Sequence, residues 1–163
     1  MIKKINILIL TIFAIGRSKY APGTMASFAT SLFFVFIYLF QVNILILILF
    51  VSLVFVYSVY SIDKFKNSFD QIDSKEIVID EFVGQSIPII TIYNFVPVNS
   101  IDIFIFLTFL AFIFFRLFDI VKPFPINKID KNMKNGFGVM LDDIIAGIYS
   151  SIILLIIISY TWI

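Results

Sequence analysis

The sequence predicts an all-α membrane protein: a bundle of about four or five transmembrane helices, preceded by a short helix. The chain is 61% hydrophobic with a mean hydropathy of +1.07, whereas a soluble domain is about 45–50% apolar. A chain of 163 residues has too much exterior to hide so much apolar surface in one core. Its apolar residues also form runs close to the roughly 20 residues that cross a bilayer as a helix. This length favours one domain over residues 1–163.

The N-terminal segment, MIKKINILILTIFAIG, carries two lysines and then an apolar run. A secretory signal peptide has the same beginning. Arg17 and Lys19 follow at once, however, and the intervening residues make a poor cleavage motif. The run at residues 5–15 is also short for a full span. We therefore expect an interfacial or re-entrant helix there.

Five later segments are the expected transmembrane helices. They are residues 25–41, 44–62, 82–98, 101–118 and 144–163. The third segment is the weakest, because Pro88 removes a helical hydrogen bond and would kink the helix. Many of these residues are β-branched, which in a soluble protein would suggest strands, but the lengths of the runs favour helices.

Charge is distributed unequally between the two sides of this predicted bundle. All 12 Lys and Arg residues lie on one side or at its boundary, and the opposite side carries only Asp102. Positive residues favour the cytoplasm, so the charged face is predicted to be cytoplasmic. The net charge of +1 gives no basic excess that would indicate a nucleic-acid partner.

The chain contains no cysteine and no histidine. Disulfides, zinc–thiolate sites, imidazole bases and cysteine nucleophiles are therefore excluded. Catalysis would have to use carboxylates, hydroxyls, Lys or Arg, or a metal held by oxygen ligands.

Four polar stretches meet at the predicted cytoplasmic face. They are GRSKYAPGTMAS (16–27), EIVIDEFVGQ (76–85), FRLFDIVKPFPI (115–126) and GFGVMLDDIIAG (136–147). Each has an ordinary structural explanation, such as a charged membrane flank, acids at a helix start or an ion pair between residues three apart. Taken together, they place several carboxylates and cations at one depth, which indicates a site.

The candidate catalytic and metal-binding residues are the carboxylates of these stretches: Asp80, Glu81, Asp119, Asp142 and Asp143. Carboxylates that converge without compensation repel one another. An oxygen-rich cluster without histidine suits a hard cation, in particular Mg²⁺ when the substrate carries phosphate. Consecutive helical residues point about 100° apart, so Asp142 and Asp143 should differ in role. One would ligate the metal while the other caps the helix or orients a ligand, in an order that the sequence leaves open.

The candidate phosphate-binding residues are Arg17, Lys19, Thr24, Arg116 and Lys122. Cationic side chains bind phosphate oxygens through short charge-assisted hydrogen bonds. A helix cap is the ordinary alternative for Thr24. From the residues alone, we expect cytoplasmic-facing, metal-assisted phosphate chemistry on a lipid.

In their order and spacing, the motifs APGTMAS, IVIDEFVGQ, FRLFDIVKPFPI and GFGVMLDDIIAG resemble the phosphatidylglycerophosphatase A family. The resemblance implies hydrolysis of phosphatidylglycerophosphate to phosphatidylglycerol and inorganic phosphate. It further implies Mg²⁺ as cofactor, the lipid bilayer as surroundings and the cytoplasmic face of the bacterial inner membrane as location. Attack by a metal-activated water and an aspartyl-phosphate intermediate both remain open.

A small cation transporter or channel is the alternative from another class of protein. Transporters place ionisable groups near the bilayer midplane, whereas the acids here crowd one boundary. A phosphotransferase that makes the phosphorylated lipid is a second alternative, but its Asp- and Gly-rich signature is missing. The sequence therefore favours the phosphatase over both.

Overall fold

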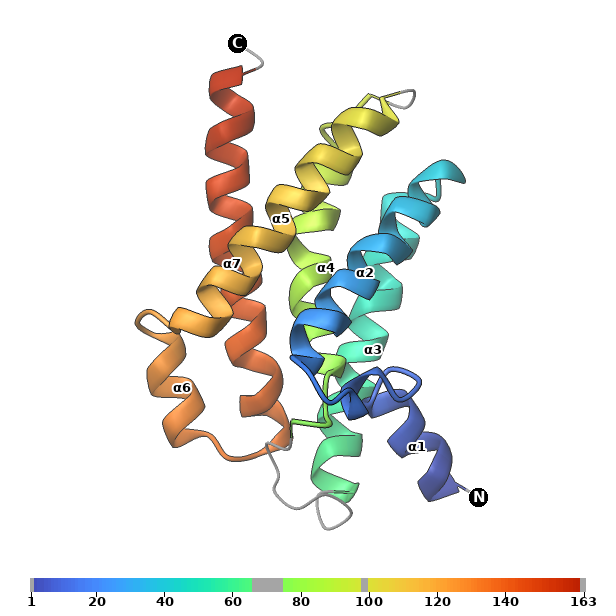
Figure 1. Cartoon of the computed structure of the whole chain (residues 1–163), viewed down its shortest axis with the longest axis vertical. Coiled ribbons are helices and arrows are strands. Elements are labelled where there is room, and N and C mark those ends of the chain that lie inside the picture. The colour runs from blue at the N-terminus through green and yellow to red at the C-terminus, as the bar shows by residue number, and fades with distance from the viewer. Residues whose placement is uncertain (1, 66–74, 98–99, 162–163) are drawn as a thin grey trace.

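The computed structural model describes residues 2–65, 75–97 and 100–161, and every regular element in these ranges is helical (Figure 1). The elements are α1 (Ile2–Leu10), η1 (Ile15–Arg17, a 3₁₀ turn), α2 (Pro22–Leu39), α3 (Ile44–Phe65), α4 (Ile79–Tyr93), α5 (Ile101–Val121), α6 (Ile126–Asn132) and α7 (Gly136–Thr161). The predicted all-α class is therefore confirmed.

Four helices, α2, α3, α5 and α7, are long and apolar enough to cross a membrane. Their outer faces expose large hydrophobic side chains, among them Phe36, Leu49, Phe106 and Ile156. Such a surface favours a lipid environment, since soluble proteins rarely expose apolar patches of this extent. The chain is thus a multi-pass membrane protein.

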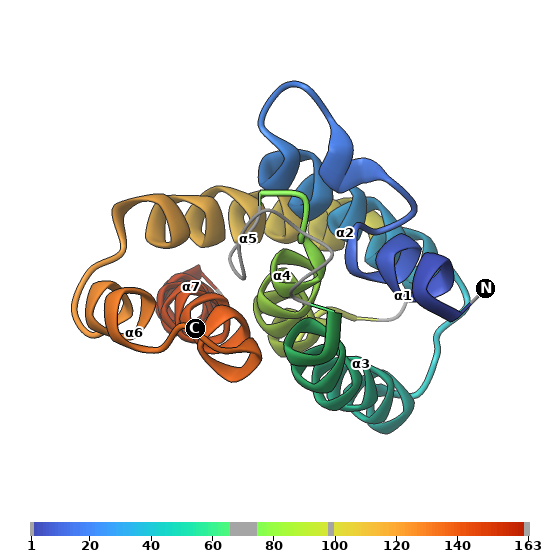
Figure 2. The same ribbon diagram turned by 90° about the horizontal axis from the view of Figure 1, so that it is seen from below.

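Helix α4 is the exception among the predicted spans. It covers Ile79–Tyr93 rather than residues 82–98, and its 15 residues rise only about 22 Å. Figure 2 shows it at the centre of the bundle, packed against α2, α3, α5 and α7. Gln85 and Ser86 are fully buried in it, and the helix continues through Pro88. Polar side chains and a helix-breaking proline are tolerated at membrane depth when neighbouring helices surround them.

Helices α4 and α7 cross at a pair of glycines. A Cβ atom at Gly84 would lie 2.8 Å from the Asp143 carbonyl oxygen, and one at Gly147 would overlap the Gly84 carbonyl. Pro88 has no N–H with which to bond that carbonyl, so it lies outside the helical ladder where α7 approaches. Small residues let backbones come this close in membrane bundles. The crossing brings the beginning of α4 beside Asp143.

The last helix begins earlier than predicted, at Gly136 instead of near residue 144. The Gly136 N–H donates to Asp63 Oδ1 at 2.7 Å, so a side chain from the end of α3 caps α7. A Cβ at Gly136 would also overlap the Val59 carbonyl. Asp142 and Asp143 therefore lie in the second turn of α7, and the predicted helix-capping role for either of them is wrong.

Asp63→Ala is expected to lower the free energy of unfolding by about 1 kcal/mol, because it leaves the Gly136 N–H without its acceptor. Thermal unfolding of the purified protein in detergent measures the change. Asp63→Asn keeps an oxygen acceptor and is the control. Equal stability of Asp63→Ala and the unchanged protein would contradict the capping role.

Helix α1 is nine residues long, about 14 Å, which is too short to cross a bilayer. The Tyr57 hydroxyl donates to Asn6, and the Val78 N–H donates to the Leu10 carbonyl at 3.1 Å. These bonds join α1 to α3 and to the segment that leads into α4. Its interfacial or re-entrant position stays a prediction.

Candidate active site

Helices α2, α4 and α7 begin and α5 ends at the same end of the bundle (Figure 1). A polar cavity of about 400 Å³ opens there. Its lining comprises Ala21, Pro22, Gly23, Thr24, Lys75, Ile77, Asp80, Glu81, Arg116, Asp119, Ile120, Lys122, Asp142 and Asp143. The structure thus brings all of the predicted carboxylates to one cavity, although they come from three helices. It also places three of the predicted phosphate ligands there, Thr24, Arg116 and Lys122.

Asp80, Glu81 and Asp143 form the tightest group. One carboxylate oxygen from each lies within 4.8 Å of the other two. Asp80 and Glu81 occupy the first turn of α4, and the Gly84–Gly147 crossing places Asp143 opposite them. Three oxygens at this separation surround a point that a single cation can contact.

The carboxylates of Asp80, Glu81 and Asp143 have too few hydrogen-bond donors to balance their negative charge. Among the described residues, no hydrogen-bond donor reaches Asp80 Oδ1, Glu81 Oε2 or Asp143 Oδ2, all of which are buried. Burial raises the pKa of Asp80 well above its ordinary value, and the charges of Glu81 and Asp143 raise it further. Both effects disfavour the ionised form of Asp80. A bound cation would offset them, because its positive charge favours the carboxylate. The residues therefore fit a divalent metal with oxygen ligands.

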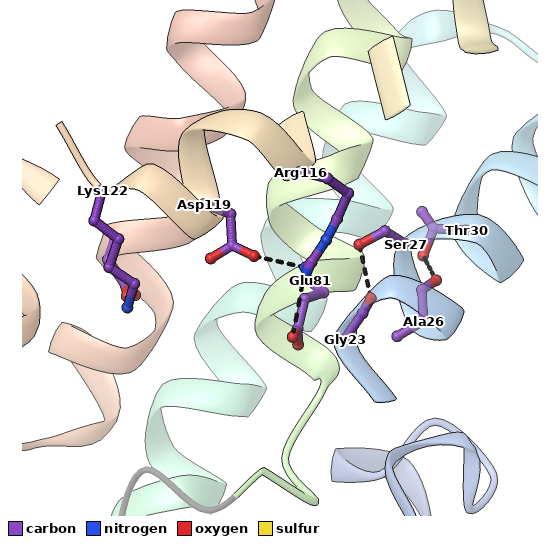
Figure 3. A network of polar contacts seen from close by, with 9 residues as sticks. Gly23, Ala26, Ser27, Thr30, Glu81, Arg116, Asp119 and Lys122 are labelled. Carbon is purple, nitrogen blue, oxygen red and sulfur yellow. Dashed lines mark hydrogen bonds and ion pairs between the residues drawn. The ribbon is translucent and has the colours of Figure 1, made fainter. Parts of the chain in front are cut away.

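Arg116 lies on the cavity wall beside this group (Figure 3). Its Nη1 is 2.5 Å from Asp119 Oδ2 and 3.9 Å from Glu81 Oε1. Gly23, in the first turn of α2, makes room for the pair, since a Cβ there would overlap Glu81 Oε1 and lie 3.2 Å from Arg116 Nη1. Gly23 therefore permits close approach of the first turn of α2 to these side chains.

Lys122 forms a second pair on the other side of the cavity. It ends α5 with a positive φ of 45°, and its Nζ lies 2.8 Å from Asp142 Oδ2 and 3.2 Å from Asp130 Oδ1. Burial disfavours the ammonium, but the hydrogen bonds and charges of Asp142 and Asp130 outweigh it and raise the pKa of Lys122. Lys122 therefore stays cationic throughout the neutral range.

The two adjacent aspartates of α7 face different partners. Asp143 belongs to the group with Asp80 and Glu81, while Asp142 pairs with Lys122. The helical twist of about 100° per residue gives them these different neighbours, and their difference in role stays a prediction.

Two predicted phosphate ligands lie outside the cavity lining. Arg17 pairs with Glu76 at 3.3 Å, and both side chains are about half exposed. Lys19 lies over the Tyr20 ring, 5.9 Å from its centroid. Both belong to the connection before α2, of which only Ala21 lines the cavity.

Lys75 and Asp130 are site residues that the sequence did not indicate. Lys75 lines the cavity next to Ile77, and Asp130 in α6 bonds the Lys122 ammonium. Lys75 directly precedes the EIVIDEFVGQ stretch, which is a local signal. Asp130 has no such signal, because only the fold of α6 against α7 brings it to Lys122.

Comparison with known proteins gives consistent matches over most of the chain. The family profile described as phosphatidylglycerophosphatase A matches residues 8–158. A phosphatidylglycerophosphatase A of Haemophilus influenzae is 38% identical over 86% of this chain and 81% of its own. The phosphatidylglycerophosphatase A of Escherichia coli is 32% identical over 87% and 77%.

A third relative carries a different name. It is a Bacteroides thetaiotaomicron protein named as a candidate phosphatidylinositol-3-phosphatase, 34% identical over 91% of this chain and 90% of its own. No solved structure gives a significant match. The profile and the relatives agree with the four motifs and the acid-lined cavity, and the chain belongs to the phosphatidylglycerophosphatase A family of membrane lipid phosphatases.

Proposed function

We propose that this protein hydrolyses the phosphate monoester of phosphatidylglycerophosphate and releases phosphatidylglycerol and inorganic phosphate. The observation that carries the proposal is the cavity itself. It combines three buried carboxylate oxygens that lack donors among the described residues with the cations Arg116 and Lys122. It also opens at an end of the bundle, where lipid headgroups lie. Two of the relatives are named for this activity.

Mg²⁺ is the proposed cofactor, and Asp80, Glu81 and Asp143 are the residues that would hold it. A bound magnesium ion supplies positive charge that polarises the phosphoryl group and lowers the pKa of water. Mg²⁺ prefers carboxylate oxygens and keeps several waters of its own. The cavity volume of about 400 Å³ leaves space for these waters and for a phosphate.

Arg116 and Lys122 are proposed to bind the phosphate oxygens from two sides. Asp119 holds the guanidinium of Arg116, and Asp142 holds the ammonium of Lys122. Fixed cations of this kind need no rearrangement when negative charge develops on the phosphoryl oxygens. In the reaction a water oxygen bonds to phosphorus while the bond from phosphorus to the glycerol oxygen breaks, and the released alcohol takes up a proton.

The proposed location is the cytoplasmic membrane of a bacterium, with the cavity on the cytoplasmic side. Among the described residues, Lys75, Arg116 and Lys122 line the cavity, whereas Asp102 lies at the opposite end, where α5 begins. Positive residues stay on the cytoplasmic side of multi-pass proteins. This orientation would give the site access to lipid made on the inner leaflet.

The test is phosphate release by the purified protein in detergent, with Mg²⁺ or with excess chelator. We expect release from phosphatidylglycerophosphate that falls at least tenfold when the metal is removed. Phosphatidylinositol 3-phosphate is the second substrate, because one relative is named for it. A clear preference for phosphatidylinositol 3-phosphate would reassign the substrate. No release from either lipid by folded protein with Mg²⁺ would refute the proposal.

A further inference from the structure

An apolar groove of about 410 Å³ lies between α2 and α5, next to the polar cavity. Its lining includes Ile15, Thr24, Phe28, Ala29, Leu32 and Phe112. Phe28 and Leu32 are each 54% exposed, so the groove opens on the membrane-facing side of α2. The small side chain of Ala29 leaves depth between these larger walls.

The groove adjoins the cavity. Thr24 lines both of them. Thr24, Phe28 and Leu32 follow one another at intervals of four residues and therefore share a face of α2. From Thr24 to Leu32 the helix rises about 12 Å. The groove thus lies beside the acid-lined cavity and follows the membrane-facing side of α2 away from it.

Its two walls are joined by an aromatic contact. The Phe28 ring of α2 meets the Phe112 ring of α5 edge to face, with centroids 6.2 Å apart. Ile15 of η1 also lines the groove, and the Ser18 hydroxyl contacts the Met25 sulfur at 2.9 Å. The groove is therefore open on its lipid side, with residues of α2, α5 and η1 as its walls.

We infer that this groove binds an acyl chain of the same lipid whose phosphate enters the cavity. The inference rests on the proposed function, since a phospholipid carries a phosphate and apolar chains on one glycerol backbone. A polar cavity and an apolar groove that meet at one threonine match that order of groups. Burying methylene groups against Phe28, Leu32 and Phe112 is favourable in proportion to the area covered. The groove would therefore select lipids by chain length and hold the headgroup in place.

A second apolar groove provides an internal comparison. It has a volume of about 570 Å³, lies among α1, α2, α3 and α4, and includes Phe50 and Leu53 in its lining. Although it is larger, it shares no lining residue with the acid cavity. It shares Ala29 with the first groove, and Ile79 of α4 is also in its lining, so it is the competing position that the experiments must distinguish.

The first experiment is photo-crosslinking with phosphatidylglycerophosphate that carries a diazirine near the end of one acyl chain, in detergent micelles. We expect label on Met25, Phe28 and Leu32 of α2 and around Phe112. Excess unlabelled phosphatidylglycerophosphate should remove this label, whereas phosphatidylcholine of the same chain length should not. Label spread evenly over the exposed helices, concentrated at Leu53, or insensitive to the competitor would overturn the inference.

The second experiment fills the groove with Leu32→Trp and compares dipalmitoyl with dihexanoyl phosphatidylglycerophosphate. We expect KM for the long-chain lipid to rise about tenfold, with kcat/KM for the short-chain lipid unchanged. Leu53→Trp in the second groove is the matched control and should change neither. An unchanged long-to-short ratio in Leu32→Trp, with full activity on the short-chain lipid, would overturn the inference while the proposed function stands.

Failure of the proposed function has a different signature. If the unmodified protein hydrolyses neither lipid, the activity is refuted, and the crosslinking pattern still decides whether the groove binds an acyl chain. If Leu32→Trp loses activity on both lipids equally, the substitution has damaged the fold. The crosslinking result on the unmodified protein then decides.

Discussion

Asp143→Asn is expected to lower turnover about 100-fold or more while the protein still folds and inserts. Asn has nearly the same shape as Asp, and Asp143 is only 4% exposed, so packing against α4 should persist. The change removes one charge from the group that would hold the metal. A bound metal contributes several kcal/mol to the stabilisation of a phosphoryl transition state, and each 1.4 kcal/mol is a factor of ten in rate.

The matched control is Asp102→Asn, the same chemical change in the first turn of α5 at the opposite end of the bundle. We expect it to keep full activity. Phosphate release at saturating Mg²⁺ measures turnover, and gel filtration in detergent verifies folding. Near-normal turnover of Asp143→Asn, together with an unchanged Mg²⁺ requirement, would remove Asp143 from the site.

Most of the bundle could be predicted from the sequence, because its signals are local. Apolar runs located α2, α3 and α5 to within a few residues, since bilayer thickness dictates their length. Helix boundaries set by distant residues were not visible. Asp63, which is 73 positions away along the chain, accepts the Gly136 N–H at the beginning of α7. The local cap at Asn135, whose Oδ1 accepts the Gly138 N–H, is a signal that an apolar run does not contain, so the run alone places that helix too late.

The candidate site also has features with a local signal in the sequence and features that depend on how the helices pack. Its carboxylates could be predicted because every one of them lies in a recognisable motif at a helix end on one face. Their grouping could not, since it depends on how α4 and α7 cross at Gly84 and Gly147. Arg17 was predicted as a phosphate ligand from charge alone, but charge does not reveal that Glu76 holds it outside the cavity.

Gly147→Ala is expected to lower kcat/KM at least tenfold, although Gly147 carries no chemical group. The added Cβ would overlap the Gly84 carbonyl, and because that atom belongs to the backbone no side-chain rotation can relieve the clash. Overpacking of this kind costs about 1–3 kcal/mol of stability, and the helices can avoid it only by moving apart. Movement of α7 would carry Asp143 away from Asp80 and Glu81, and a displacement of about 1 Å can cost a factor of 100 in rate.

Two measurements distinguish a displacement of the carboxylates in Gly147→Ala from a general loss of the fold. Thermal unfolding in detergent should show a modest loss of stability for Gly147→Ala, while the Mg²⁺ concentration for half-maximal activity should rise, because the ligands no longer converge. Ile148→Ala, at the next and more exposed position of α7, is the control and should alter neither. Because the acids sit on two helices that touch through backbone atoms, the distance between those helices sets the distance between the ligands. Unchanged activity and an unchanged Mg²⁺ requirement in folded Gly147→Ala would show that the α4–α7 spacing does not control the site.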